Sequence, residues 1–478
     1  MKVLLVNPPR FQGIPVIREE RCEITERYSV LPPYSLLQIA ALLRQGGHQV
    51  FLIDANGENI AYREVAHRLQ DASYDALIFR FTPTTFDWDV EVAKLSKSLY
   101  PQAKTIGICY TLRTMSEDVL VRAPSLDIYI RHEYEVVTSQ LIDALAGGSN
   151  LAQVSGISHR QDDSIAHNPD AQPIADYDSL PMPAYDLLPG FKNYFINTPA
   201  GKPFTIMYTS KGCPYGCIFC TVARTKWRKR SAESILAELK YLKQNYSIRT
   251  VSFFDETFTI DRKRVTQIAN EITEADLDIK WYCNTRVELV DEELLKVMYR
   301  GGCRGISYGI ESGNHEVLDN ARKGSTVEQA ENAVKWAKKA GIKTYCSFIF
   351  GLPGETPETV AETLSFIKCL RPTGAQFNVA VPYPGTELYD MVYKETAQPL
   401  PGWDNLYQHQ AVIGTQALSP HELEQARLSA YRALYFNPRW WLQNIGHVLR
   451  HPEDFDLASR YVLKVVNNYF FHKMEHAH

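Results

Sequence analysis

The chain has 478 residues, of which 45% are hydrophobic and 22% are charged, a composition typical of a globular protein with about two to four domains. Lys and Arg number 51 against 55 Asp and Glu, so the net charge of −4 gives no indication of a nucleic-acid-binding protein. No apolar run approaches the roughly 20 residues of a membrane span. Three clustered cysteines among nine predict a metal site in a reducing, cytoplasmic compartment.

Residues 1–150 alternate between strand and helix patterns, which predicts an α/β domain with a doubly wound (Rossmann-like) parallel sheet. The expected strands are residues 2–7, 49–54, 74–81, 104–110 and 127–131. The expected helices are residues 33–45, 61–70, 89–100 and 137–146. Ligands of such sheets bind beyond the carboxyl ends of the strands. The candidate binding residues at those ends are Asn7, Asp54, Thr82 and Glu133.

Residues 151–202 are rich in proline and read as a connector with a hairpin tip near 161–165. Alternation resumes over residues 203–390. The expected strands there are residues 204–209, 250–255, 280–285, 305–310, 343–350 and 376–380. The expected helices are residues 232–245, 263–274, 291–300, 326–340 and 357–370. Residues 391–478 are expected to be mostly helical, with one helix from Ser419 to about Phe436.

Three cysteines follow the first strand of this second region in a C-x₃-C-x₂-C run. They are Cys213, Cys217 and Cys220. Three thiolates at this spacing can each ligate one iron of a cubane [4Fe-4S] cluster, which leaves the fourth iron open for another ligand. A fully structural site normally uses four protein ligands. The run therefore predicts a cluster with an open coordination position.

The run Lys211-Gly-Cys-Pro-Tyr-Gly-Cys-Ile-Phe-Cys220 resembles the cluster loop of the radical S-adenosylmethionine (SAM) enzymes. In that family SAM chelates the open iron, and one electron from the cluster splits SAM to give a 5′-deoxyadenosyl radical. The six strands after residue 203 resemble the partial (β/α)₆ barrel of these enzymes. The resemblance implies SAM contacts at Phe219, Asp255, Glu256, Arg286, Glu311, Ser312, Gly351 and Gly354.

The N-terminal layout resembles the cobalamin (B12)-binding domain found ahead of radical SAM domains. The similar stretches are "NPP", "LPPYSLLQIAALLRQGGHQV" and "LIDAN". The resemblance implies that Asn7, Asp54, Thr82 and Glu133 line a cobalamin site whose lower face lacks a His ligand. Two turns depart from the family's glycine-rich pattern, at residues 107–111 and 131–135. Because glycines let a backbone approach a bulky ligand closely, the alternative is a domain of the same fold that binds another ligand or none.

Together the two resemblances imply a cobalamin-dependent radical SAM enzyme that methylates an unactivated carbon of a small-molecule, lipid or natural-product substrate. Flavodoxin or ferredoxin would be the electron donor. The alternatives are a radical rearrangement, oxidative cyclisation or carbon–carbon coupling without methyl transfer, and a non-catalytic cluster- or ligand-sensing protein. No residue pattern identifies a catalytic acid or base.

The tail after residue 396 carries aromatic side chains among basic ones. These aromatic residues are Trp440, Trp441, Tyr461, Tyr469, Phe470 and Phe471. They predict helices packed against the open side of the barrel, a wall of the substrate pocket, or an interfacial face for a lipid-like substrate. The last of these would place the protein at the periphery of a membrane.

Overall fold

The computed structural model describes residues 1–19, 23–24, 29–196, 201–396 and 402–450. The chain divides into two units. Unit 1 comprises Met1–Phe195, Pro203–Ile248 and Pro382–Tyr407, and unit 2 comprises Ile196–Lys202, Arg249–Val381 and the chain from Gln408. No helix among the described residues is long and apolar enough to cross a membrane.

The larger sheet of unit 1 has the strand order β4-β1-β5-β6-β7-β8-β9. Its strands are β1 (Lys2–Asn7), β4 (Gln49–Asp54), β5 (Ala76–Arg80), β6 (Lys104–Ile108), β7 (Ile128–Ile130), β8 (Ile157–Gln161) and β9 (Ser164–His167). The first five are parallel, whereas β8 and β9 form an antiparallel hairpin that extends the sheet beyond β7. The predicted doubly wound sheet is confirmed. The sequence predicts the hairpin tip but not its pairing with β7.

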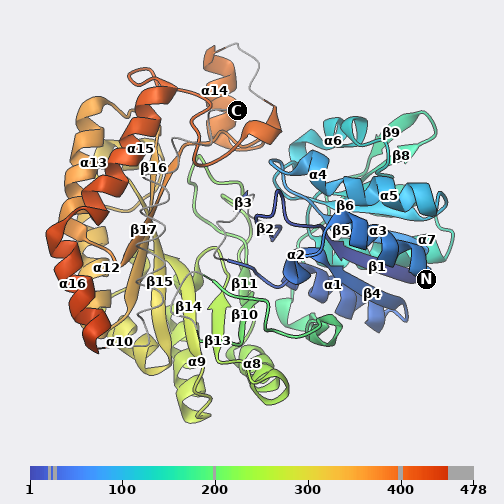
Figure 1. The fold of residues 1–478 in the computed structure, drawn as a ribbon, viewed down its shortest axis with the longest axis horizontal. Coiled ribbons are helices and arrows are strands. Elements are labelled where there is room, and N and C mark those ends of the chain that lie inside the picture. The colour runs from blue at the N-terminus through green and yellow to red at the C-terminus, as the bar shows by residue number, and fades with distance from the viewer. Residues whose placement is uncertain (20–22, 25–28, 197–200, 397–401, 451–478) are drawn as a thin grey trace. The chain divides into compact units, whose positions relative to one another are not determined.

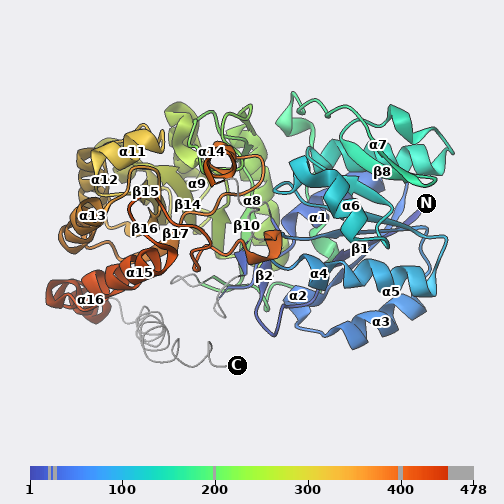
Figure 2. The same cartoon turned by 90° about the horizontal axis from the view of Figure 1, so that it is seen from above.

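Two pairs of helices cover the two faces of this sheet (Figures 1 and 2). Helix α1 (Tyr34–Gln45) packs beside α7 (Tyr134–Ala146), and α3 (Tyr62–Asp71) packs beside α5 (Glu91–Leu99). The shorter helices are α2 (Ala55–Glu58), α4 (Phe86–Asp89) and α6 (Ser116–Arg122). Fully buried strand residues such as Leu5, Ile78 and Ile106 fill the core between these layers and bury apolar area that stabilises the domain.

The second large sheet has the strand order β10-β13-β14-β15-β16-β17. Its strands are β10 (Phe204–Met207), β13 (Thr250–Phe253), β14 (Lys280–Arg286), β15 (Cys303–Glu311), β16 (Lys343–Phe350) and β17 (Gly374–Val379). All pairings from β13 to β17 are parallel. The alternating helices are α8 (Ala232–Tyr246), α9 (Arg262–Glu274), α10 (Glu292–Arg300), α12 (Val327–Ala340) and α13 (Pro357–Leu370). These six strands with intervening helices confirm the α/β fold class that the sequence predicts for this region.

The remaining helices are α11 (His315–Asn320), α14 (Glu387–Thr396), α15 (Pro420–Tyr435) and α16 (Pro438–Arg450). A capping box between Ser419 and Glu422 starts α15, which packs on α13 and β17. On α16, Trp440 donates from Nε1 to the Pro372 carbonyl at 2.8 Å, so this ring packs within unit 2. Tyr461, Tyr469, Phe470 and Phe471 lie outside the described residues.

Candidate functional site

The cysteine loop, residues 212–227, leaves and re-enters a short antiparallel ribbon of unit 1. The ribbon pairs β11 (Ser210–Lys211) with β12 (Arg228–Lys229). Within the loop, the Thr225 amide donates to the Cys213 carbonyl at 2.9 Å, and the Cys213 amide donates to Thr225 Oγ1 at 2.9 Å. These bonds close the base of the loop and fix the first cysteine.

The three cysteines lie on this one loop. Cys213 and Cys217 are buried and Cys220 is half-buried, with its amide donating to the Cys217 carbonyl at 3.2 Å. No group of three acidic, His or Cys side chains among the described residues converges on a single metal ion. A cubane cluster does not need such convergence, because each thiolate ligates a different iron. The donor set therefore fits a cluster with three protein ligands, and the half-buried Phe219 lies between the second and third cysteines.

Gly212 allows the loop to turn immediately before its first cysteine. Its φ is +89°, and a Cβ built there would lie 2.3 Å from the Lys226 carbonyl oxygen. Only glycine combines this left-handed backbone with so close an approach. The conformation at the start of the loop is therefore determined by the backbone of Gly212 and not by a side chain.

A segment far along the chain also holds the loop. The Leu388 amide donates to the Ile218 carbonyl at 2.9 Å, and Glu387 contacts Arg224 at 3.4 Å. Both partners belong to unit 1. The cysteine loop is thus contacted from the start of α14 as well as from its own ribbon.

Two buried ion pairs join the ribbon to the start of α7. Lys211 Nζ contacts the Glu135 carboxylate at 2.8 and 3.0 Å. Arg228 donates to both oxygens of Glu133, at 2.7 and 2.9 Å. Burial alone would raise the pKa of Glu133, but Lys211 and Arg228 outweigh burial and hold that pKa below its ordinary value. Glu133, predicted to bind a cofactor, is therefore engaged by the ribbon of the cysteine loop.

The strand ends of β1 and β4 carry the predicted residues Asn7 and Asp54 side by side. Asn7 Nδ2 donates to Asp54 Oδ1 at 2.7 Å, and Tyr194 Oη donates to Asp54 Oδ2 at 2.6 Å. Asp54 also accepts the Gly57 amide at 2.9 Å and so caps α2. Burial raises the pKa of Asp54 despite these three donors. The proline-rich connector is thereby bound to this end of the sheet through Tyr194.

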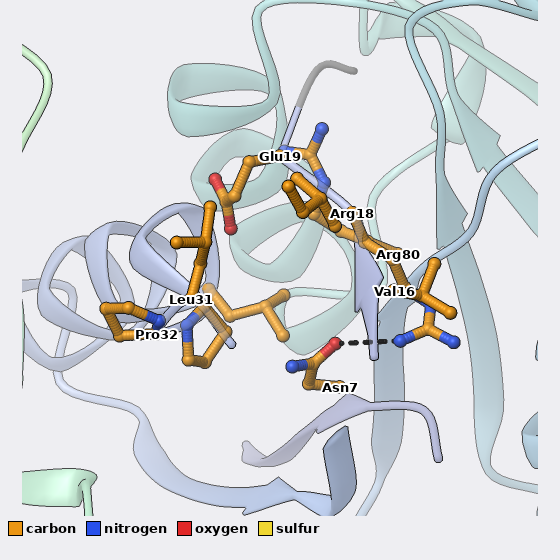
Figure 3. A pocket seen from close by; sticks show the side chains of 10 residues that line it. Asn7, Val16, Arg18, Glu19, Leu31, Pro32 and Arg80 are labelled. Atoms are coloured by element: carbon orange, nitrogen blue, oxygen red, sulfur yellow. Dashed lines mark hydrogen bonds between the residues drawn. The ribbon is translucent and has the colours of Figure 1, made fainter. Parts of the chain in front are cut away.

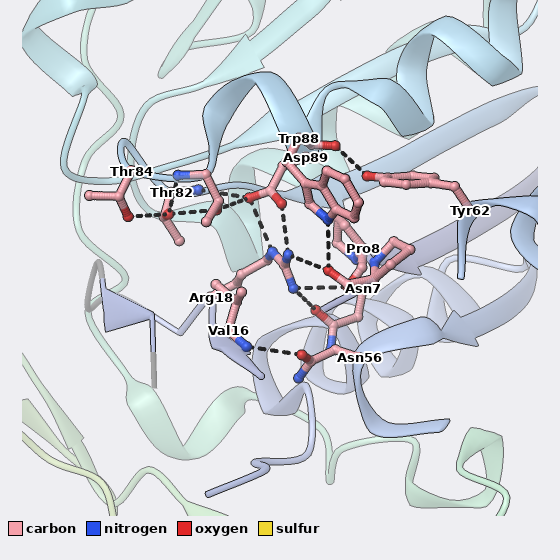
Figure 4. A network of polar contacts seen from close by, with 12 residues as sticks. Asn7, Pro8, Val16, Arg18, Asn56, Tyr62, Thr82, Thr84, Trp88 and Asp89 are labelled. Atoms are coloured by element: carbon pink, nitrogen blue, oxygen red, sulfur yellow. Dashed lines mark hydrogen bonds and ion pairs between the residues drawn. The ribbon is translucent and has the colours of Figure 1, made fainter. Parts of the chain in front are cut away.

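An Arg18–Asp89 ion pair lies beside the predicted residue Thr82 (Figure 4). Arg18 contacts Asp89 at 2.7 and 3.1 Å and also donates to the carbonyls of Pro8 and Pro9 at 2.9 Å. The Thr82 amide donates to Asp89 at 3.2 Å. Asn7 Oδ1 accepts from Arg18 at 3.3 Å, so Asn7 and Thr82, both predicted from their strand ends to bind a ligand, contact one buried network, whose central ion pair was not predicted.

A pocket opens next to this network (Figure 3). Its wall combines charged and polar side chains (Asn7, Arg18, Glu19 and Arg80) with apolar ones. The apolar residues are Val16, Ile17, Leu31, Pro32, Pro33 and, on α1, Leu36. The Glu19 carboxylate accepts the Ser35 amide at 3.2 Å and so caps α1. The pocket lies at the carboxyl end of β1, where doubly wound sheets bind ligands.

In unit 2, the predicted SAM-contact residues follow successive strands. Asp255 is fully buried and Glu256 is half-buried directly after β13. Asn284, on the neighbouring strand β14, donates from Nδ2 to the Asp255 carbonyl at 3.2 Å. This amide contact ties the end of β13 to β14 and leaves the two acidic residues at the strand end.

Arg286 and Glu311 occupy the ends of β14 and β15. Arg286 is buried, bonded to Glu288 and to the Lys323 carbonyl. Glu311 accepts from Lys323 Nζ at 2.9 Å and from Ser347 Oγ at 3.4 Å. Lys323 thus lies next to both predicted residues through different atoms.

Ser312, Gly351 and Gly354 complete the predicted set. Ser312 Oγ lies 3.2 Å from Thr363 Oγ1 on α13 and accepts the Asn314 amide at 3.2 Å. Gly351 and Gly354 have φ of +94° and +83°, as a tight turn requires. The Gly351 amide donates to the Glu355 carboxylate, which is buried. Burial raises the pKa of Glu355 to about 7.

Sequence reasoning missed the buried charges that hold these residues: Arg18, Asp89, Glu135, Lys211, Arg228 and Lys323. Lys211 stands in the cysteine motif and Arg228 lies shortly after it, but their partners are 76 and 95 residues away. The one available signal was the "HEYE" stretch, where His132 and Tyr134 stand at the glycine positions of the family pattern beside the two acidic residues. His132, in the same stretch, contacts Asp170 at 3.0 Å.

A model of the radical SAM superfamily matches residues 207–367. An uncharacterised methyltransferase of Pyrococcus horikoshii is 31% identical over 448 residues, 93% of this chain and 95% of that protein. An anaerobic magnesium-protoporphyrin IX monomethyl ester cyclase of Rubrivivax gelatinosus is 29% identical over 400 residues, 81% of this chain and 69% of that protein.

Among solved structures, the cobalamin-dependent SAM radical enzyme OxsB with aqua-cobalamin and SAM bound aligns with a TM-score of 0.75 at 18% identity. The alignment covers 97% of this chain and 71% of that chain. This likeness supports the arrangement of elements described above.

Proposed function

This chain belongs to the radical SAM superfamily, and from that premise we propose that it is a cobalamin-dependent methyltransferase acting on an unactivated carbon of a small molecule. The observation that carries the proposal is the cysteine loop, with Cys213, Cys217 and Cys220 on one backbone-fixed turn. Cys213, Cys217 and Cys220 would hold a [4Fe-4S] cluster, which would supply the electron for cleavage of SAM to a 5′-deoxyadenosyl radical.

In this proposal the strand ends of unit 2 bind and orient SAM. Asp255 and Glu256 receive its ammonium group, and Arg286 faces its carboxylate, since a guanidinium suits that group. Glu311 and Ser312 contact the ribose. The turn at Gly351 and Gly354 packs against adenine. The buried partners Lys323 and Glu355 hold these groups in place before SAM arrives.

The N-terminal domain is proposed to hold cobalamin, which supplies the carrier for the methyl group. Supporting this are the fold shared with OxsB, which binds aqua-cobalamin, and the apolar wall formed by Leu31, Pro32 and Leu36. The polar groups of Asn7 and Asp54 already bond to each other, so the apolar wall and backbone would provide most of the fit. A flavodoxin or ferredoxin is the proposed electron donor, because SAM cleavage consumes an electron.

Oxidative cyclisation without methyl transfer is the second candidate. It is favoured by the 29% identity to the cyclase of Rubrivivax gelatinosus. Side chains at positions where the cobalamin family carries glycines also favour it. Tyr134, for example, is buried between Lys211 and Arg80, and its ring occupies space that a glycine would leave open.

The test is anaerobic reconstitution with iron and sulfide, followed by hydroxocobalamin, desalting and an absorption spectrum. The protein is then incubated with methyl-deuterated SAM and dithionite, and 5′-deoxyadenosine is measured by mass spectrometry. We expect cluster absorption, about one retained cobalamin, and release of 5′-deoxyadenosine. Cys213→Ala should abolish cluster absorption and release, whereas Cys369→Ala, at an exposed thiol on α13, should change neither.

Each outcome separates the candidates. Retained cobalamin supports methyl transfer, and substrate trials then search for deuterated methyl groups in the product. A cluster without cobalamin, but with 5′-deoxyadenosine release, supports cyclisation instead. A wild-type protein that forms no cluster, or a Cys213→Ala variant identical to wild type, would refute both.

A further inference from the structure

The ribbon at the neck of the cysteine loop places two cations, one from each strand, directly opposite each other. Lys211 on β11 pairs in register with Arg228 on β12. Their acceptors, Glu135 and Glu133, stand two residues apart at the start of α7. Two cross-strand neighbours therefore contact two neighbouring carboxylates, and both ends of the loop are held at one place in the fold.

Both ion pairs are buried. The side chains of Lys211 and Glu135 are 10% and 2% exposed, and those of Arg228 and Glu133 are 5% and 10% exposed. Removing one partner of such a pair leaves an uncompensated buried charge, whereas replacing both partners by neutral side chains of similar size is tolerated far better. The bidentate geometry of Arg228 adds directional constraint to its pair.

Tyr134 adds a contact to Lys211 from the start of α7. Lys211 Nζ lies 4.1 Å from the centre of the Tyr134 ring, and the Arg80 guanidinium lies 4.8 Å from it. Cations at these distances are attracted to an aromatic ring. Arg80 also lines the pocket at the carboxyl end of β1. A continuous set of buried contacts thus runs from that pocket to the residue two positions before Cys213.

We propose that Lys211 and Arg228 are positioning residues whose ion pairs with Glu135 and Glu133 hold the cysteine loop on α7 in the arrangement that accepts the cluster. The inference rests on the proposed function in one respect, the assignment of Cys213, Cys217 and Cys220 as cluster ligands. Purely global stabilisation would not require both acceptors to lie in one turn of α7 and both donors to face each other across the ribbon.

The test measures the cysteine loop in cluster-free protein, where no cofactor is needed. Iodoacetamide alkylation of Cys213 and Cys217 is followed by mass spectrometry in wild type, Lys211→Met, Lys211→Arg and the neutral pair Lys211→Met/Glu135→Gln. Thermal unfolding is recorded for each. The control pair is Arg18→Met/Asp89→Asn, whose side chains are equally buried, at 2% and 0% exposure, and do not contact the loop.

We expect Lys211→Met and the neutral pair to speed alkylation of Cys213 about tenfold, because the loop opens more often without its ion pair. The neutral pair should recover most of the thermal stability that Lys211→Met loses, yet stay fast in alkylation. Lys211→Arg should remain near wild type, and the control pair should not change alkylation. After reconstitution, the neutral pair should retain less iron and give an altered electron paramagnetic resonance spectrum.

Unchanged alkylation in the folded neutral pair would overturn the proposal, as would equal acceleration in the control pair. If Lys211→Met fails to fold, the same alkylation assay on the neutral pair and on Arg228→Lys tests the proposal. Arg228→Lys keeps the charge but loses the bidentate contact. Failure of wild-type protein to bind iron would instead refute the proposed function while leaving the alkylation comparison intact.

Discussion

Lys323 donates from Nζ to Glu311 Oε1 at 2.9 Å, and each of the two side chains is only 6% exposed. Glu311 ends β15 with a φ of +73°, a left-handed conformation that few non-glycine residues adopt. A Cβ built at Gly309 would lie 2.5 Å from Glu311 Oε1 and 2.9 Å from Lys323 Nζ. The absence of a side chain at residue 309 therefore makes room for this ion pair at the proposed SAM site.

Lys323→Met should destabilise the protein by about 3 kcal/mol, because it leaves the buried Glu311 carboxylate without its partner. The double variant Lys323→Met/Glu311→Gln should recover much of that loss, since both charges are then removed. Urea unfolding monitored by circular dichroism measures the free energy of unfolding. A double variant as unstable as the single one would show that Lys323 contributes through packing and not through the ion pair.

Gly212→Ala should prevent the cysteine loop from closing. The new Cβ would approach the Lys226 carbonyl oxygen to 2.3 Å, and alanine is also strained at this positive φ. We expect loss of iron binding after reconstitution. Gly148→Ala is the matched control, because Gly148 has a φ of +64° with nothing within 4 Å of the added Cβ. It should cost about 1 kcal/mol and leave iron binding unchanged; equal iron binding in both variants would contradict this account.

Local patterns in the sequence predicted most strands and the residues at their ends. The strand ending at Asp54 follows from an apolar run that ends in a polar residue. Its pairing with the strand of Asn7 depends on the strand order, which the local pattern does not predict. Helix starts were predicted less closely than strand ends. The expected helix from residue 137 begins at Tyr134, because the backbone turns at Glu133, with a φ of +52°, and Tyr134 is buried. An acidic, aromatic "HEYE" stretch does not reveal this burial.

Contacts between distant segments could not be predicted from local pattern. The pairing of β8 with β7, the contact of Tyr194 with Asp54, and the ion pair of Lys211 with Glu135 each depend on how the chain returns to one place. A lone basic residue in a sequence is normally solvated. Only the fold reveals that Lys211 is buried against a carboxylate.

The cysteines outside the loop should differ from one another in reactivity. Burial raises the pKa of the Cys283 and Cys346 thiols, and alkylation requires both a thiolate and access to it. We expect Cys369, which is exposed, to react with iodoacetamide in the native protein while Cys283, Cys303 and Cys346 stay unmodified. Peptide mass spectrometry at neutral pH checks this. Rapid alkylation of Cys346 without unfolding would contradict the buried position of β16.

Glu355 should make stability depend on pH in a defined direction. Burial raises its pKa to about 7 from 4.5, partly opposed by the Gly351 amide. The folded protein therefore holds this proton more tightly than the unfolded chain does. The resulting stabilisation is complete below pH 4.5 and is lost as the pH rises through 7.

Glu355→Gln keeps an acceptor for the Gly351 amide but cannot ionise, so it should remove this dependence. Relative to wild type, the variant should gain up to about 3 kcal/mol between pH 5 and pH 8, measured as the difference in free energy of urea unfolding at each pH. Glu331→Gln, on the exposed face of α12, is the control and should run parallel to wild type. A constant difference between Glu355→Gln and wild type across this range would show that the Glu355 carboxyl is already ionised at pH 5, and that solvent or a cation reaches the turn beside the proposed adenine position.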